Sequence, residues 1–427
     1  MLGLPGPMPP PPSLPGRTPL EVADVFRGEA VSFLRDYGER LSSLQKRVFS
    51  DIQACRTAVM GGHVGACDEC GHREISYNSC RNRHCPKCQA MARARWLEQR
   101  TAELLPISYF HVVFTLPAEI AALALQNKRL LYGMLFEAAS QTLMEVAANP
   151  RHLGAEIGLL AVLHSWGQNL MHHPHLHCVV SGGGLSQDGS RWIASRKHYF
   201  LPVRVLRRVF RNKFCALLGR AFRRGELKFF GELEPLAKAD AFRRFLVAVS
   251  GREWVVYAKR PFSDATCVLK YLARYTHRVA ISNSRLVNYH NGCVTFRYKD
   301  YAQQSRQRTM SLPAAEFIRR FLMHVLPAGF MRIRHFGYLA NRHRRQKLAT
   351  CRRLLGVVPP SATEVQSQDP DVKPSEDACQ TESTTRCPAC QKGRMRVIET
   401  FERRPRRGCC SSPGLPRNSG TPIKDSS

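Results

Sequence analysis

The chain has 427 residues, of which 44% are hydrophobic, so it is long enough for two or three domains and can bury a sizeable core. Lysine and arginine outnumber aspartate and glutamate by 64 to 33, and the net charge of +31 favours a polyanionic partner such as nucleic acid. No apolar run approaches the roughly 20 residues of a transmembrane helix. The start lacks the basic and apolar regions of a secretory signal. We therefore expect no membrane partner and a cytoplasmic location.

The N-terminal part of the chain changes character twice. Residues 1–17 form a Pro/Gly tract that reads as a disordered extension. Residues 18 to about 60 place apolar residues among charges in a helical pattern, and residues 61–90 are rich in Cys, Gly, His and Arg. We expect residues 18–100 to form one helical and zinc-binding domain that contacts DNA.

Cysteine spacing predicts a metal site in that domain. Sixteen cysteines without an export signal, several of them in Cys-x-x-Cys pairs, indicate a reducing compartment and metal binding. Two pairs separated by 14 residues can supply four thiolates to one tetrahedral structural zinc: Cys67, Cys70, Cys85 and Cys88. Cys80 and His84 lie between the pairs and could replace a ligand, so the four are assigned only as a group. Buried structural cysteines are the alternative, and nearby arginines suggest DNA contact.

The main core is predicted over residues 105–356. Its first half should contain a strand at 109–116, a helical region at 121–148, and strands at 158–164 and 175–180, the second of which is closed by three glycines at 182–184. Its second half should contain a basic helix at 203–223, a strand at 254–258 and a helix from about 264 to 280. A hairpin at 285–300 should turn at Asn291-Gly292. Two of the strands are joined too closely for a parallel crossover. This order predicts an α+β fold, with a central antiparallel sheet and flanking helices.

A histidine pair marks the predicted sheet. His175 and His177 are two residues apart, so on a strand they share a face while Leu176 and Cys178 point to the other. Two imidazoles on a rigid strand can hold a divalent metal with positions left open for a substrate phosphate. His164, offset as a cross-strand neighbour of His175, and Gln168 are candidate third ligands. Ordinary polar packing is the alternative.

A tyrosine pair follows in a segment with helical periodicity. Tyr271 and Tyr275 are four residues apart and would share a helix face. A tyrosine can attack a DNA phosphodiester and conserve the bond energy in a phosphotyrosine link. Its phenol, with an ordinary pKa of about 10, would need help from a metal or from neighbouring cations. Aromatic core packing is the alternative for the pair taken alone.

The end of the chain reads as a linker and a mostly disordered tail over residues 357–427, because its first part is polar, acidic and contains proline. Cys387 and Cys390 form a further Cys-x-x-Cys pair. Their partners would have to be Cys409 and Cys410, which are adjacent and therefore awkward for tetrahedral chelation. We therefore do not expect a second zinc site there, beyond a weak metal-binding tendency.

Taken together, the motifs resemble the HUH-class rolling-circle transposases of bacterial insertion sequences, in the two-tyrosine branch. The matching segments lie between about residues 20 and 356: CRTAVMGGHVGACDECG (55–71), SCRNRHCPKCQ (79–89), HPHLHCVVSGGGL (173–185), YLARYTHRVAISNSRL (271–286) and GYLANRHRRQKL (337–348). The resemblance implies an N-terminal zinc-binding domain and an HUH-type tyrosine nuclease domain. It further implies Mg²⁺ or Mn²⁺ at His175 and His177, and Tyr271 and Tyr275 as nucleophiles.

The function expected from the sequence is transposition. Such an enzyme would cleave and rejoin single-stranded DNA at element ends and in target DNA through a 5′-phosphotyrosine intermediate, near the bacterial nucleoid. A plasmid replication initiator or relaxase would share this chemistry. A catalytically inactive zinc-dependent DNA-binding protein would explain the charge and the cysteines but would leave the histidine and tyrosine pairs unexplained.

Overall fold

The computed structural model describes residues 20–89, 96–97, 101, 103–196, 200–259, 280–300, 306–357 and 386–403. The chain forms two compact units. The larger unit comprises Met1–Cys55 and Cys80–Glu376, and the smaller unit comprises Arg56–Ser79 and Asp377–Ser427. The range 18–100, which the sequence groups as one domain, is therefore shared between the two units.

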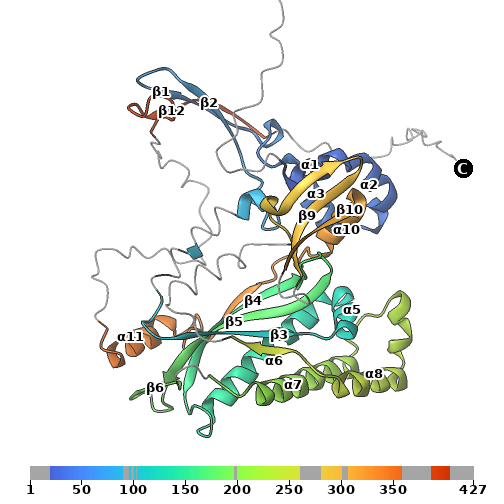
Figure 1. Ribbon diagram of the computed structural model, residues 1–427, viewed down its shortest axis with the longest axis vertical. Helices are drawn as coiled ribbons and strands as arrows, with labels where there is room; N and C mark the ends of the chain where they lie inside the picture. The colour runs from blue at the N-terminus through green and yellow to red at the C-terminus, as the bar shows by residue number, and fades with distance from the viewer. Residues whose placement is uncertain are drawn as a thin grey trace, which may run out of the picture. The chain divides into compact units, whose positions relative to one another are not determined.

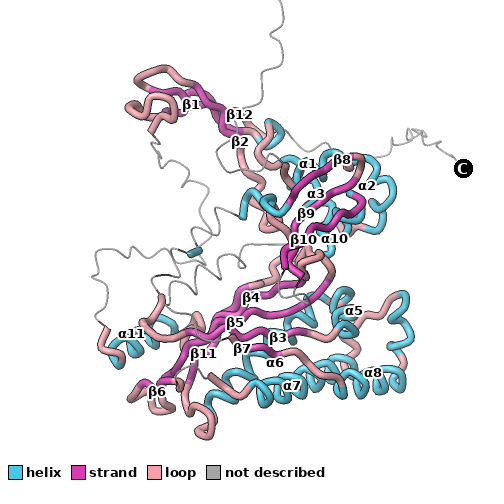
Figure 2. The backbone as a smooth tube through the Cα atoms, in the orientation of Figure 1, coloured by secondary structure: helices cyan, strands magenta, loops and turns pink. Residues whose placement is uncertain are grey.

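A six-stranded sheet organises the larger unit, and every pairing in it is antiparallel (Figure 2). The strand order is β11-β4-β5-β3-β7, with β6 paired to β5. The strands are β3 (Tyr109–Thr115), β4 (Glu156–Trp166), β5 (His172–Leu185), β6 (Trp192–Ala194), β7 (Val256–Ala258) and β11 (Ile333–Gly337). This confirms the predicted α+β fold with a central antiparallel sheet. Strand β5 does not end before the three glycines, as was expected, but continues through them to Leu185. Glycine is needed at position 184 because a Cβ there would clash with the carbonyl of Glu156 on the neighbouring strand β4.

Four helices cover one face of this sheet (Figure 1). They are α5 (Ala118–Gln126), α6 (Lys128–Ala148), α7 (Val203–Arg223) and α8 (Ala239–Gly251). Helix α7 has the predicted bounds, whereas the predicted helical region at 121–148 is divided at Asn127, whose side chain donates to the carbonyls of Leu123 and Lys228. Alternate residues of β5 (Leu176, Cys178 and Val180) are buried in the core beneath the helices. The other residues of β5 therefore face the opposite side.

A second layer of the larger unit joins N-terminal and C-terminal segments. It contains a three-stranded antiparallel sheet, β8 (Leu286–His290), β9 (Cys293–Asp300) and β10 (Arg306–Pro313), and the helices α1 (Val22–Gly28), α2 (Ala30–Tyr37), α3 (Ser43–Ala54) and α10 (Ala314–Met323). The β8–β9 hairpin turns at Asn291 and Gly292, as predicted, because both adopt positive φ angles of 47° and 68°. Phe26 contacts Phe49 and Phe321 with ring centroids 5.2 and 5.3 Å apart, which joins α1, α3 and α10 in one core.

Shorter elements complete the larger unit. Helix α11 (Arg344–Leu354) follows β11, and 3₁₀ turns lie at Gly38–Arg40, Gly231–Ala237 and Asn283–Arg285. Among all the helices of the described residues, none has the length and apolar character needed to cross a membrane.

The smaller unit is a three-stranded antiparallel sheet in the order β12-β1-β2, built from β1 (Gly62–Cys67), β2 (Arg73–Tyr77) and β12 (Met395–Phe401), with a 3₁₀ turn at Ala58–Met60. The expectation of a mostly disordered tail is therefore corrected for residues 386–403. Strand β12 gains its partner from β1, which lies more than 300 residues earlier. No local pattern around β12 could have identified that partner.

Candidate metal centres and active site

Three histidines meet on the sheet face opposite the four helices. His164 lies on β4, and His175 and His177 lie on β5. The antiparallel register pairs His164 directly with His175, which confirms the predicted cross-strand neighbour. One ring nitrogen from each of the three lies within 4.8 Å of the others, a separation that lets a single ion contact all three. The structure therefore brings His164 together with the two predicted ligands.

The environment of this cluster keeps the imidazoles in the form that binds metal. His164 is 2% exposed and His177 is 9% exposed. Burial, reinforced by His173, lowers the pKa of His175 to about 4. Burial, followed by the neighbouring His164 and His175, lowers the pKa of His177 well below its ordinary value. Neutral rings with free lone pairs are what a divalent cation requires.

Hydrogen bonds orient the ligand nitrogens. Nδ1 of His175 lies 2.7 Å from the carbonyl oxygen of His173. Because a carbonyl can only accept, Nδ1 carries the proton and Nε2 keeps its lone pair. That Nε2 lies 3.2 Å from Nε2 of His177, so the two candidate ligand atoms converge.

His111 supports the cluster from β3, and the sequence did not identify it. Its Nε2 lies 2.8 Å from Nδ1 of His177, and the two rings are stacked with centroids 5.0 Å apart. This contact directs the other nitrogen of His177 toward the metal position, as outer-sphere partners of metal-bound histidines do. The alternation of side chains along β3 could have placed His111 on the same face as the histidine cluster, but only if the pairing of β3 with β5 were already known.

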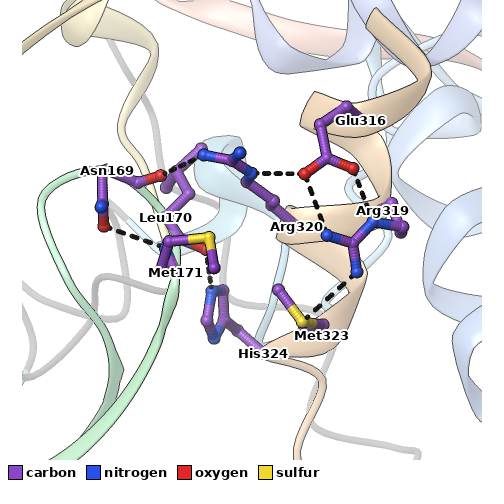
Figure 3. Close-up of polar contacts among 8 residues, drawn as sticks. All are labelled: Asn169, Leu170, Met171, Glu316, Arg319, Arg320, Met323 and His324. Carbon is purple, nitrogen blue, oxygen red and sulfur yellow. Dashed lines mark hydrogen bonds and ion pairs between the residues drawn. The ribbon is translucent and has the colours of Figure 1, made fainter. Parts of the chain in front are cut away.

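The turn between β4 and β5 is fixed by α10 (Figure 3). Arg320 donates to the carbonyl of Asn169 at 3.1 Å, and Nε2 of His324 donates to the carbonyl of Leu170 at 3.0 Å. Glu316 accepts from both Arg319 and Arg320, and hydrogen bonds and charge from these two arginines lower its carboxyl pKa to about 2. The second layer thus holds the hairpin that carries the histidines.

Gln168, the other candidate third ligand, lies in the same turn. Its backbone carbonyl accepts from Arg285 at 2.6 Å, and its side-chain oxygen lies 3.5 Å from the backbone nitrogen of Lys299. Of the two candidates, His164 is the one that the structure places beside His175 and His177.

Tyr271 and Tyr275 lie outside the described residues. The chain enters that segment beside the histidine cluster, because the backbone nitrogen of Lys259 donates to the carbonyl of His111 at 2.9 Å. It leaves the segment at Ala280 and Ile281, which are buried in the core of the second layer. Both ends of the segment that contains the tyrosines therefore lie within the larger unit.

The predicted zinc ligands do not share one site, which corrects the sequence-based grouping. Cys85 and Cys88 lie with Cys55 and Cys80 in the larger unit, and the Sγ atoms of Cys55 and Cys80 each lie 3.5 Å from Sγ of Cys88. Cys80 thus takes the ligand position that the sequence left open. His84 does not join, because its Nε2 accepts from the backbone nitrogen of Leu326 at 3.1 Å.

The other predicted pair belongs to a second cluster in the smaller unit. Cys67 and Cys70 lie with Cys387 and Cys390. The pairing of β1 with β12 brings these cysteines together, so the expectation that Cys387 and Cys390 lack suitable partners is wrong. Cys409 and Cys410, the partners considered from the sequence, lie outside the described residues.

Comparison with known proteins places these sites in a family context. The family model described as "Putative transposase" matches residues 158–347, and the model described as "Transposase zinc-binding domain" matches residues 25–116. The first range contains the β4–β5 hairpin with its three histidines. The second contains Cys55, Cys80, Cys85 and Cys88 but not Cys387 or Cys390.

Two relatives resemble the chain over most of its length. "Putative transposase y4qJ" of Sinorhizobium fredii (strain NBRC 101917 / NGR234) is 56% identical over 384 residues, which cover 90% of this chain and 96% of that protein. "Transposase for insertion sequence element IS801" of Pseudomonas savastanoi pv. phaseolicola is 29% identical over 357 residues, which cover 82% and 83% of the two chains. No solved structure matches the chain.

Proposed function

Because this chain belongs to the insertion-sequence transposases that carry an N-terminal zinc-binding domain, we propose that it cleaves and rejoins single-stranded DNA through a covalent 5′-phosphotyrosine intermediate. The observation that carries the proposal is the convergence of His164, His175 and His177 on the face of the sheet. Three imidazole nitrogens within 4.8 Å of one another form a candidate site for a divalent metal, which DNA cleavage would use and DNA binding alone would not require. The segment containing Tyr271 and Tyr275 begins at Lys259, beside this cluster.

The three histidines are the residues that would hold a divalent metal. A set made only of imidazoles suits Mn²⁺ better than Mg²⁺, which prefers oxygen ligands. When bound, the metal would polarise the scissile phosphate as a Lewis acid and offset charge in the transition state. His111 and the carbonyl of His173 hold the rings of His177 and His175 in the orientation this requires.

The tyrosines would supply the nucleophile. The phenol of Tyr271 or Tyr275 would lose its proton to a base or to solvent as its oxygen forms a bond to phosphorus. The bond to the 3′ oxygen of the upstream nucleotide breaks, and that oxygen takes up a proton to become a free hydroxyl. Rejoining is the reverse attack by a 3′ hydroxyl on the phosphotyrosine. Each step exchanges one phosphodiester for another, so no nucleotide cofactor is needed.

Basic surfaces of the larger unit would follow the DNA backbone. A groove of about 360 Å³ is lined by Arg252, Glu253, Trp254 and four arginines of α7: Arg204, Arg207, Arg208 and Arg211. Of these four, Arg207 is paired with Glu253, which leaves Arg204, Arg208 and Arg211 for phosphate contact. In the segment around α11, Arg342 and Arg345 are exposed, whereas Arg344 is 17% exposed and paired with Glu103 at 3.3 Å. We assign phosphate contact to the groove and to the two exposed arginines.

We expect Arg342→Ala/Arg345→Ala to weaken binding to single-stranded DNA and to flatten its salt dependence. Two lost phosphate contacts should reduce the slope of log K against log salt by about 1.4, at about 0.7 per contact. Fluorescence anisotropy across a salt series measures this slope. The matched control is Arg243→Ala, an exposed arginine of α8 that pairs with Asp240 at 2.7 Å. Equal slopes in the double variant and the wild type would remove α11 from the DNA path.

The covalent intermediate is the direct test of the proposed function. Purified protein, Mn²⁺ and single-stranded DNA from both ends of the element should yield a protein–DNA adduct that survives denaturation. We expect Tyr271→Phe/Tyr275→Phe to abolish the adduct, because no phenol remains to attack, while DNA binding persists. The single variants assign each tyrosine to an end. An adduct that persists in the double variant would mean another nucleophile, and tight binding without any adduct in the wild type would favour an inactive DNA-binding protein.

A further inference from the structure

The described part of the smaller unit has no apolar core that could hold its sheet together. Within the described parts of this unit, residues 56–79 and 386–403, no side chain belongs to any of the hydrophobic core clusters. Several of its large apolar side chains are instead exposed, among them Ile75 at 42% and Val397 at 59%. An isolated small sheet without a core is marginal in water and needs a covalent or metal cross-link.

Two turns of matching geometry meet at one end of this sheet. In the first, Gly71 has a φ angle of 68° and its backbone nitrogen donates to the carbonyl of Cys67 at 3.2 Å. In the second, Gln391 has a φ angle of 56° and its backbone nitrogen donates to the carbonyl of Cys387 at 2.9 Å. Each turn therefore closes in the same way around its own Cys-x-x-Cys pair.

Backbone donors point at the sulfur atoms of this cluster. The backbone nitrogen of Glu69 donates to Sγ of Cys67, and that of Gly393 donates to Sγ of Cys390, each at 3.4 Å. Hydrogen bonds of this kind stabilise thiolate more than thiol, because they favour the charged form. Gly393 leaves the necessary room, since a Cβ there would lie 2.5 Å from Sγ of Cys67.

The sulfur separations fit a metal and not a disulfide. Sγ of Cys67 lies 3.7 Å from Sγ of Cys390, and Sγ of Cys70 lies 3.7 Å from Sγ of Cys387. A disulfide would require about 2.05 Å. A tetrahedron of Zn–S bonds of about 2.3 Å has edges of about 3.8 Å, which agrees with the separations found here.

We propose that Cys67, Cys70, Cys387 and Cys390 bind a second structural zinc, distinct from the site at Cys55, Cys80, Cys85 and Cys88. This ion joins two turns separated by 317 residues between Cys70 and Cys387. It makes the segment after residue 386 an integral part of a fold that begins at Arg56. The C-terminal cysteine pair is therefore required for the N-terminal hairpin to fold, although the two lie at opposite ends of the chain.

Zinc stoichiometry tests this proposal. The full-length chain should carry His175→Ala/His177→Ala, so that the histidine cluster contributes no metal. By elemental analysis after gel filtration, we expect two zinc ions per chain in this background and one after Cys387→Ser/Cys390→Ser is added. Cys293→Ser, at an exposed cysteine outside both clusters, is the matched control and should retain two. Unchanged zinc content in the Cys387→Ser/Cys390→Ser variant would overturn the proposal.

The reactivity of the cysteine thiols shows which cluster has lost its zinc ion. It also distinguishes the loss of one site from unfolding of the whole chain. In native buffer, N-ethylmaleimide should spare all eight cluster cysteines of the parent chain. After Cys387→Ser/Cys390→Ser, mass spectrometry should find Cys67 and Cys70 modified while the other cluster stays protected. Protection of Cys67 and Cys70 in that variant would show that they have other ligands. Exposure of Cys55 and Cys85 as well would show that the two sites are not independent, and either result contradicts the proposal.

Discussion

His177→Ala is expected to reduce DNA cleavage by at least about 100-fold while leaving DNA binding close to that of the wild type. His177 is the central member of the histidine cluster, since it contacts His111, His164 and His175. Loss of outer-sphere partners alone commonly costs about 10–100-fold in metal affinity or activity, so loss of a ligand should cost no less. Single-turnover cleavage of a labelled strand in saturating Mn²⁺ measures the rate. The matched control is His290→Ala, at an exposed histidine of β8 that is not part of the histidine cluster.

His111→Ala should behave differently from His177→Ala. Its expected effect is a higher Mn²⁺ requirement, by about 10–100-fold, with the rate largely restored at saturating metal. A purely structural role for His111 would lower the rate at every metal concentration and would also lower the unfolding temperature. If His177→Ala cleaves as fast as His290→Ala, the histidine cluster is not the metal centre of this enzyme.

The histidine cluster shows how far a sequence pattern can reach. The two-residue spacing of His175 and His177 placed them on one face because strands alternate, and the structure confirms this. The offset of His164 predicted its cross-strand position because the β4–β5 turn is short. His111 was not identified, because its place depends on the register between β3 and β5, which are separated in the chain by two helices and by β4.

The cysteines show where sequence reasoning fails. Cys67, Cys70, Cys85 and Cys88 were grouped because they are close in the sequence, but each pair finds its partners elsewhere. Cys80 lies between the two pairs and was named as a possible replacement ligand, whereas Cys55 precedes both pairs and was not considered. Cys387 and Cys390 lie at the far end of the chain. Strand pairing between β1 and β12 decides the second grouping, and such pairing depends on contacts across the whole chain and leaves no local pattern.

The predictions of helices and strands also succeeded where local patterns specify an element and failed where a distant partner does. Helix α7 and the hairpin at Asn291-Gly292 were predicted because local periodicity and positive φ at the turn specify them. Strand β12 was taken for a mostly disordered tail because its acidic, proline-containing surroundings dominate the composition of the segment. The β-branched and aromatic residues of β12 are a local strand signal, but they do not identify β1 as its partner.

Cys88→Ser is expected to destabilise the larger unit by more than about 4 kcal/mol, as loss of a structural metal typically does. The Sγ atom of Cys88 lies 3.5 Å from the Sγ atoms of both Cys55 and Cys80. Its replacement therefore removes the sulfur that contacts two other members of the cluster. The loop held by this cluster also supports the chain after α10. Arg83 donates to the carbonyls of Phe330 and Pro327 at 2.6 and 2.9 Å, and Leu326 donates to His84.

Thermal unfolding followed by circular dichroism measures this effect, and a chain of this size should show a fall in Tm on the order of 10 °C. Treatment of the wild type with a zinc chelator should give at least as large a fall, because it also removes the zinc proposed at Cys67, Cys70, Cys387 and Cys390. Cys215→Ser, at a half-buried cysteine of α7 outside both clusters, controls for the substitution itself. If Cys88→Ser and Cys215→Ser unfold at the same temperature, the cluster at Cys55, Cys80, Cys85 and Cys88 does not contribute a metal to the stability of the fold.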